Sequence, residues 1–225
     1  MRTAVSTYSF KQDVHAQLAR VGKALASSGR LELLDCVAQA PRSVEELAVM
    51  TRLSVANASK HLQELRRAGL VRARKEGLRV FYEVAGPDVV GLIAALGNVA
   101  ETRLAEMEQL VRTYITARDE LEPIPVAEML KRSKLGLVTV LDVRPATEFA
   151  AGHLPGAINV PVEDLGKGPA KFSKRREVIA YCRGPYCLLA VDAVALLRTK
   201  GYKARRLVGG FLEWKASGLP IEGGP

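Results

Sequence analysis

The chain has 225 residues, of which 48% are hydrophobic and 25% are charged. This length accommodates two domains of about 100 residues each, and the composition allows each of them a hydrophobic core. No apolar run reaches the roughly 20 residues of a membrane helix, and Met1–Val5 lacks the apolar block of a secretory signal. A membrane protein is thereby excluded and a cytoplasmic protein is expected. The three cysteines, Cys36, Cys182 and Cys187, argue against a disulfide framework but leave cysteine chemistry open.

The net charge of +9 is not concentrated in one half of the chain, since residues 1–121 carry +3 and residues 122–225 carry +6. Basic residues do cluster between Arg52 and Arg79, a stretch that contains eight basic and only two acidic residues. Local clustering of this kind predicts contact with nucleic acid better than the total charge does.

Helices are expected first in chain order. Apolar residues recur with a helical period over 10–26, and a second helix is expected over 30–38, before Pro41. Ser43 and Glu46 then form a capping-box pattern, which starts a third helix that ends near residue 50.

A fourth helix is expected over 55–67, with Ser54 as its cap and Gly69 at its end. Residues 70–84 follow as a β-hairpin, and Pro87 opens a long helix to about residue 117. Two short helices, a tight link and a basic hairpin predict a winged helix-turn-helix in a mainly α domain. Its second short helix would enter the major groove, and the hairpin arginines would reach flanking phosphates.

The pattern changes at Glu122–Pro125, a stiff stretch that predicts a boundary between a domain over 1–121 and a domain over 122–225. Beyond it, strands and helices alternate, which predicts a three-layer α/β domain around a parallel sheet. Strands are expected at 137–142, 157–159, 177–181 and 204–208, and helices at 125–133, 146–151, 187–200 and 210–217.

The stretch 53–71, Leu-Ser-Val-Ala-Asn-Ala-Ser-Lys-His-Leu-Gln-Glu-Leu-Arg-Arg-Ala-Gly-Leu-Val, resembles the recognition-helix signature of the ArsR/SmtB family of bacterial repressors. The hairpin residues 74–82 resemble the same family, and the match covers about 10–117. The resemblance implies a homodimer, built from the first and last helices, on a palindromic operator in double-stranded DNA. The residues expected to contact DNA are Ser54, Asn57, Ser59, Lys60, His61, Arg66, Arg72, Arg74, Lys75 and Arg79.

The polar residues of this helix also have an alternative interpretation, a solvated helix face. Asn57 can read adenine with two hydrogen bonds and Ser59 can reach a phosphate or a base, so DNA contact is favoured beside such a hairpin. His61 differs, because it can instead point inward beside Leu62.

The usual inducers of this family are metals, and the resemblance shows which ligands this chain lacks. Ser43–Glu45 stands where arsenic- and cadmium-type members carry Cys-x-Cys. The positions at which zinc-type members carry Asp and His hold Gly86, Asp88, Val99 and Thr102. Neither a metal site nor a cofactor is expected. Cys36, the one thiol of this half, is expected to be a small buried hydrophobic residue.

Cys182 follows the apolar run 178–181 and precedes a helix expected to start near Cys187. A thiol in that place meets backbone amides and the positive end of a helix dipole, so a lowered pKa is expected for Cys182, with Arg183 adding charge. Such a site can hold a persulfide anion or a thiosulfate oxygen. The expected chemistry is double displacement: the thiolate takes a sulfane sulfur from a donor such as thiosulfate or polysulfide, and an acceptor removes it.

Residues 141–161 resemble the first signature of rhodanese domains and 209–221 resemble the last one, within a match over about 124–223. The resemblance implies a catalytic loop of Cys182, Arg183, Gly184, Pro185, Tyr186 and Cys187, with Asp142 and Arg144 nearby. It further implies that Arg144 pairs with Glu148 and that Trp214 belongs to the core.

Loop length distinguishes sulfur transfer from phosphate chemistry. Related phosphatases and arsenate reductases have a Cys-x5-Arg loop, but here Cys187 and Leu188 hold the last positions and no arginine ends the loop to bind phosphate. Phosphatase activity is therefore not expected. Cys187 has two interpretations: a small residue at the helix start, which is favoured, or a resolving thiol that captures sulfur from Cys182.

Three hypotheses follow for the whole protein. The first is a transcriptional regulator whose rhodanese domain senses or delivers sulfane sulfur through Cys182. The second is a sulfurtransferase whose winged helix serves only dimerisation or interaction. The third is a sensor that binds sulfur without turnover.

Overall fold

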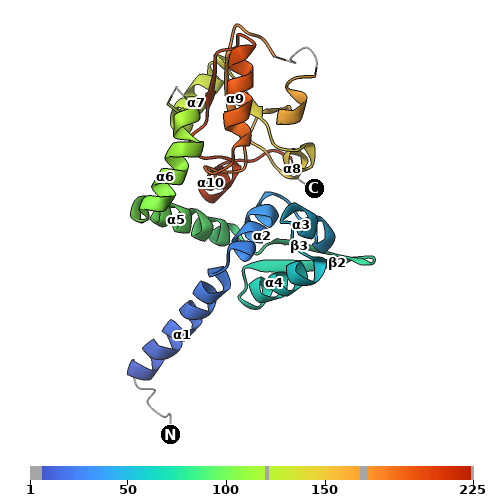
Figure 1. Ribbon diagram of the computed structural model, residues 1–225, viewed down its shortest axis with the longest axis vertical. Coiled ribbons are helices and arrows are strands. Elements are labelled where there is room, and N and C mark those ends of the chain that lie inside the picture. Colours follow the sequence, from blue (N-terminus) through green and yellow to red (C-terminus); the bar gives the residue numbers. More distant parts are fainter. Residues whose placement is uncertain (1–6, 120–121, 168–171, 224–225) are drawn as a thin grey trace. The chain divides into compact units, whose positions relative to one another are not determined.

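A computed structural model describes residues 7–119, 122–167 and 172–223 (Figure 1). The chain separates into two compact units between Val89 and Val90. The boundary predicted at 121–122 lies later in the chain, and Leu121 is outside the described residues, so that division stays a prediction. In the part of the chain that the structure describes, no helix has both the length and the apolar character needed to cross a bilayer.

The first unit is a winged helix-turn-helix. Its helices are α1 (Thr7–Leu25), α2 (Ser28–Gln39), α3 (Val44–Met50) and α4 (Val55–Arg67). Strands β2 (Val71–Glu76) and β3 (Arg79–Val84) form the predicted hairpin, and β1 (Arg42–Ser43) pairs with β3. Strand β1 is not predicted from the sequence, because a strand of two residues is too short to show an alternation of apolar and polar residues.

Both caps of the helix-turn-helix are confirmed. Ser43 Oγ accepts a hydrogen bond from the Glu46 amide, and the Glu46 carboxylate accepts one from the Ser43 amide. Ser54 Oγ caps α4 by accepting from the Asn57 amide at 3.2 Å. Between the two helices the chain turns through Arg52, whose φ of 54° lies in the left-handed region. The start and direction of α4 are thereby set by local hydrogen bonds.

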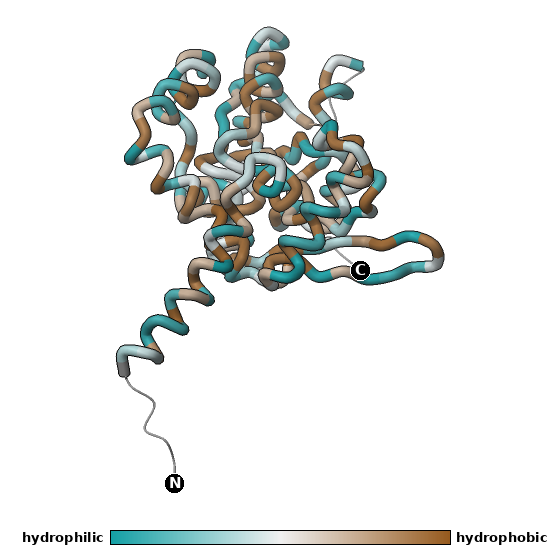
Figure 2. The backbone as a smooth tube through the Cα atoms, turned by 60° about the horizontal axis from the view of Figure 1, so that its bottom comes forward, coloured by the Kyte–Doolittle hydropathy of each residue, from teal (hydrophilic) through white to brown (hydrophobic). Residues whose placement is uncertain are grey.

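Packing holds α4 against the rest of the first unit. Leu62 and Leu65 of α4 are completely buried, as are Leu33 and Leu34 of α2 and Leu47 of α3. The hairpin, by contrast, extends from its unit with one largely hydrophilic strand (Figure 2). The apolar side of α4 is therefore used for the core, which leaves its polar side for solvent or a ligand.

The remaining helices and strands belong to the second unit, except that α5 begins three residues before the division. The helices are α5 (Pro87–Arg103), α6 (Ala105–Tyr114), η1 (Thr116–Arg118), α7 (Val126–Lys134), α8 (Ala146–Ala151), η2 (Val162–Asp164), α9 (Leu189–Thr199) and α10 (Phe211–Ala216). The strands are β4 (Val138–Asp142), β5 (Ile158–Asn159), β6 (Glu177–Tyr181) and β7 (Ala204–Arg206).

The single long helix predicted to about residue 117 is wrong, because the backbone is extended at Leu104 (φ −111°, ψ 113°) and separates α5 from α6. The chain changes direction there (Figure 1). Just before the break, Thr102 Oγ1 donates to the carbonyls of Asn98 and Val99. A threonine that bonds back in this way favours bending of a helix.

The strands form a parallel sheet in the order β5-β4-β6-β7, with helices on both faces. On one face, Val178 and Ala180 of β6 pack with α9. On the other face, Ile179 and Tyr181 of β6 pack with residues of α7 and α10. One of these is Trp214, of which 2% is exposed. The three-layer prediction and the core position of Trp214 are confirmed. The alternation along β6 places Cys182, the next residue, on the α9 face.

Candidate functional site

Cys182 lies where β6 ends and the loop to α9 begins, and only 2% of its surface is exposed. The helix starts at Leu189, two residues later than expected. Cys182 Sγ is 3.3 Å from the carbonyl oxygen of Cys187 and 3.8 Å from that of Gly184. The loop thus folds around the sulfur atom.

The two loop cysteines are free thiols that are hydrogen-bonded to each other. Backbone amides of Gly184 and Ala190 donate to the Cys182 sulfur. Amides of Arg183 and Leu189 donate to the Cys187 sulfur. Each sulfur atom therefore has one amide from the loop and one from the first turn of α9, an arrangement that stabilises negative charge.

The lowered pKa predicted for Cys182 is wrong. Its hydrogen bond to Cys187, followed by burial, raises the pKa of Cys182 well above its usual value, because Cys182 remains the donor. The same hydrogen bond lowers the pKa of Cys187 to about 7, and the amide of Arg183 contributes. The negative charge of the pair at neutral pH is therefore carried first by Cys187.

Gly210 packs directly against the backbone of the cysteine loop. Amides of Phe211 and Leu212 donate to the carbonyls of Cys182 and Arg183 at 2.9 and 3.0 Å. A Cβ on Gly210 would lie 2.6 Å from the carbonyl oxygen of Cys182 and 2.6 Å from the Gly184 nitrogen. Only glycine fits between these backbone atoms, which explains this residue of the last rhodanese-like signature.

The charged groups next to the loop are paired, and all but the half-buried Arg183 are fully buried. The Arg183 guanidinium binds both oxygens of Glu148, a carboxylate with no exposed surface, at 2.6 to 3.1 Å. Asp142 and Arg144 are equally buried and pair at 2.7 Å, and Arg144 also donates to the Gly152 carbonyl. The ion pair of Asp142 and Arg144 thus stabilises the C-terminal end of β4, next to the loop. The predicted pairing of Arg144 with Glu148 stays a prediction.

Tyr186 connects the loop to α5. Its hydroxyl donates to the Glu101 carboxylate at 3.1 Å, and its ring lies against Gly97, where an added Cβ would be 3.0 Å from that hydroxyl. Burial and the neighbouring Glu101 carboxylate raise the pKa of Tyr186 to about 12, which keeps the hydroxyl a donor at neutral pH. The sequence carries no signal of this contact, since 85 residues separate its two partners.

The residues expected to contact DNA mostly lie on exposed surface. Asn57 and Lys60 are exposed on α4, and so are Arg66 near its end and the wing residues Arg72, Arg74, Lys75 and Arg79. Arg74 pairs with Glu76 at 2.7 Å on the exposed wing. Leu78 at the tip is fully exposed.

Three of the expected DNA contacts have roles within the protein. Ser54 is the cap of α4, and Ser59 is half-buried and accepts a hydrogen bond from Gln63. His61 is half-buried, with its ring next to Gly29 of α2. The inward alternative for His61 is therefore the better description. Cys36, expected to be a small buried hydrophobic residue, is half-buried.

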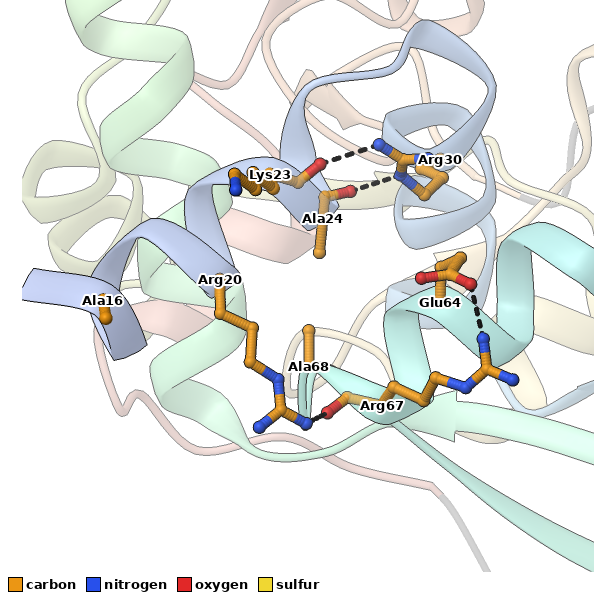
Figure 3. Close-up of a pocket in the computed structure, with 8 residues that line it drawn as sticks. All are labelled: Ala16, Arg20, Lys23, Ala24, Arg30, Glu64, Arg67 and Ala68. Carbon is orange, nitrogen blue, oxygen red and sulfur yellow. Dashed lines mark hydrogen bonds and ion pairs between the residues drawn. The ribbon is translucent and has the colours of Figure 1, made fainter. Parts of the chain in front are cut away.

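A pocket of about 290 Å³ lies between α1, α2 and α4 and was not expected from the sequence (Figure 3). Arg30 donates to the carbonyls of Ala24 and Lys23 at 2.5 and 2.8 Å, and Arg20 donates to the carbonyl of Arg67. These arginines tie the three helices to one another, so the pocket is part of the helix junction.

Known proteins match both parts of the chain. The arsR family of bacterial regulatory proteins matches residues 27–73, and the rhodanese-like domain matches residues 125–217. The HTH-type transcriptional regulator Rv0324 of Mycobacterium tuberculosis is 44% identical over 208 residues, which cover 92% of this chain and 91% of that protein. A sulfurtransferase of Allochromatium vinosum is 33% identical over 85 residues, which cover 37% of this chain and 78% of that protein.

A solved homodimeric winged helix-turn-helix domain from Mycobacterium bovis is 42% identical, covers 47% of this chain and 95% of its own, and has a TM-score of 0.42. The mycobacterial regulator that spans nearly all of this chain establishes the family, and the two matched regions coincide with the winged helix and with the parallel sheet. This chain is therefore a transcriptional regulator of the arsR family that carries a rhodanese-like domain behind its helix-turn-helix.

Proposed function

We propose that this regulator binds a palindromic operator as a homodimer, and that a sulfane sulfur bound to Cys182 changes its affinity for DNA. The observation that supports this most is the position of Tyr186. It belongs to the loop that surrounds Cys182, and it also contacts α5. A change in the loop around the sulfur would therefore reach α5, which lies outside the rhodanese-like sheet, through Tyr186.

DNA contact is supported by the outer side of α4 and by the wing. Asn57 and Lys60 are exposed on the helix that a major groove accommodates, with Arg72 and Arg79 exposed on the adjacent hairpin. Asn57 is suited to reading a base edge, and the cations are suited to phosphates. His61 is not included in this proposed interface, because it packs beside Gly29.

A homodimer is supported by apolar side chains that the single chain leaves uncovered. On α1, Tyr8, Phe10 and Leu18 are 60 to 73% exposed. On α5, Leu96 and Val99 are 39% and 57% exposed. Exposed apolar positions repeated along a helix favour association, and the first and last helices of the winged-helix region are the expected dimer interface. Two copies would then match the two halves of a palindrome.

Sulfur binding is supported by the amides that point at Cys182. Donors from Gly184 and Ala190 would stabilise the anion of a Cys182 persulfide. The cation of the loop, Arg183, is held by Glu148, so the backbone amides are the groups proposed to stabilise a persulfide anion. Thiosulfate and polysulfide are the proposed donors.

Coupling between sulfur and DNA is supported by the chain segment that links them. Helix α5 spans the division between the two units, since it runs from Pro87 to Arg103. After α6, Asp119 is nearly buried and pairs with Arg198 at 3.0 Å and Arg206 at 2.6 Å. A segment anchored in this way can transmit a displacement of the loop, whereas a loose tether could not.

A sulfurtransferase enzyme is the second candidate, favoured by the loop itself and by the similarity to the Allochromatium protein named a sulfurtransferase. Steady-state turnover of thiosulfate and cyanide measures this activity. The salt dependence of DNA affinity tests the regulator. A plot of the logarithm of the binding constant against the logarithm of the salt concentration should have a slope of about −0.9 for each phosphate contact. Salt-dependent binding that polysulfide alters supports the regulator. Turnover with a flat salt dependence supports the enzyme alone.

A further inference from the structure

Cys187 is part of the sulfur site in its own right. Its thiol is hydrogen-bonded to that of Cys182, and its carbonyl oxygen is the nearest acceptor to Cys182 Sγ, at 3.3 Å. Its sulfur receives two backbone amides, as does that of Cys182. Cys187 also packs against the buried cluster that contains Cys182, and it lies two residues before the start of α9, so it is placed beside the Cys182 sulfur and not at the first residue of the helix.

We propose that Cys182 and Cys187 form a dithiol site that reduces one bound sulfane sulfur to sulfide and closes to a disulfide. This inference rests on the proposed sulfur binding at Cys182. It adds what becomes of the bound sulfur. The state that changes DNA affinity would be the Cys182–Cys187 disulfide, formed with release of sulfide, and not a lasting persulfide on Cys182.

The chemistry has two balanced steps. In the first, the Cys182 thiolate attacks the sulfane sulfur of thiosulfate, the S–S bond of the donor breaks, and sulfite leaves with the electron pair. In the second, the Cys187 thiolate attacks Cys182 Sγ, the bond to the outer sulfur breaks, and that sulfur leaves as hydrosulfide. The two cysteines lose two electrons and the sulfane sulfur gains them. No other oxidant or reductant is needed.

The protonation states fit this sequence. Cys187 is the first of the pair to ionise, with a pKa lowered to about 7, so it can take the proton of Cys182 as the donor arrives. Once Cys182 carries the sulfane sulfur, Cys187 passes that proton to the outer sulfur, which can then leave as hydrosulfide, and the Cys187 thiolate becomes the second nucleophile. Each sulfur has two backbone amides of its own that stabilise its negative charge.

The two steps have different products, so one experiment separates them. The reduced full-length protein is mixed with thiosulfate, and sulfite, sulfide and protein mass are followed together. Wild type is expected to release sulfite and then sulfide, up to one of each per chain, and to lose two hydrogen atoms in mass. Trypsin cleaves after Arg183, so a disulfide appears as two joined peptides, one with each cysteine.

Variants identify the residues responsible. Cys187→Ser is expected to release sulfite but no sulfide and to keep one added sulfur atom. Cys182→Ser is expected to release neither, and Cys36→Ser, which changes the thiol in α2, should behave as wild type. Sulfite without sulfide from wild type, with the added sulfur retained as in Cys187→Ser, would overturn the dithiol inference and leave sulfur binding intact. If wild type gains no sulfur from either thiosulfate or polysulfide, the proposed function itself fails.

Discussion

The Tyr186 hydroxyl donates a hydrogen bond to the Glu101 carboxylate at 3.1 Å, and this bond joins the cysteine loop to helix α5. Tyr186 immediately precedes Cys187 in the chain. Under the proposed function, a rearrangement of the cysteines would displace the residue that contacts α5, and this contact is the route by which sulfur chemistry would reach DNA binding.

Removal of that hydroxyl should weaken the coupling without preventing sulfur uptake. Tyr186→Phe keeps the ring against Gly97 but removes a hydrogen bond of about 0.5–1.5 kcal/mol. The effect of polysulfide on operator affinity should therefore shrink by roughly two- to tenfold. Affinity is measured by fluorescence anisotropy on a duplex selected from random DNA by the wild-type protein. Tyr114→Phe, on the exposed side of α6, is the control, and equal coupling in both variants would show that the Glu101 contact is not used.

The reactivity of Cys187 should depend on pH with a midpoint near 7. Its pKa is lowered to about 7, so the thiolate fraction grows as pH rises through that value and falls below it. Alkylation of Cys187 by iodoacetamide, followed by mass spectrometry in a Cys36→Ser background, measures this midpoint. Cys182→Ala removes the donor that lowers the pKa and should move the midpoint upward. A midpoint that does not respond to Cys182→Ala would contradict the described hydrogen bond.

Gly210→Ala should disable the sulfur site. The new Cβ would lie 2.6 Å from two backbone atoms of the loop, which must shift, at a cost of about 1–3 kcal/mol. Sulfur uptake should fall sharply while DNA affinity without sulfur stays unchanged. Gly166→Ala is the matched control, since its Cβ would meet nothing within 4 Å and its φ is not positive. Normal sulfur uptake by Gly210→Ala would disprove the close approach.

Substitutions on α4 should separate affinity from sequence reading. Lys60→Ala is expected to lower affinity for all sequences and to reduce the salt slope by about 0.9. Asn57→Ala is expected to relax the preference at one base pair, at a cost of about 1–3 kcal/mol. Lys131→Ala removes the same charge from an exposed position on α7 and should change neither property. Equal losses from Lys60→Ala and Lys131→Ala would indicate that only net charge matters.

Local signals made most of the fold predictable from the sequence. The caps at Ser43 and Ser54 and the hydrophobic period of α4 depend on neighbours a few residues away, and they are confirmed. The parallel sheet follows from alternating strands and helices. The break at Leu104 has no proline or glycine to announce it, because it arises from backbone geometry after Thr102.

The site was less predictable, because its properties depend on contacts that only folding creates. The location of Cys182 at a strand end is clear from the sequence, but its raised pKa comes from the orientation of its thiol toward Cys187. The same is true of the contact between Tyr186 and Glu101, and of Arg183 binding Glu148. In each case a residue type was visible in the sequence and its partner was not.

Operator binding by wild type and by Cys182→Ser, each with and without polysulfide, tests the central claim most directly. Both proteins should bind the selected duplex with the same affinity when reduced, because Cys182 lies outside the winged helix. Polysulfide should change the affinity of wild type by at least about fivefold, a typical allosteric coupling, and leave Cys182→Ser unchanged. Equal responses of the two proteins, or no response in either, would contradict control of DNA binding by sulfur at Cys182.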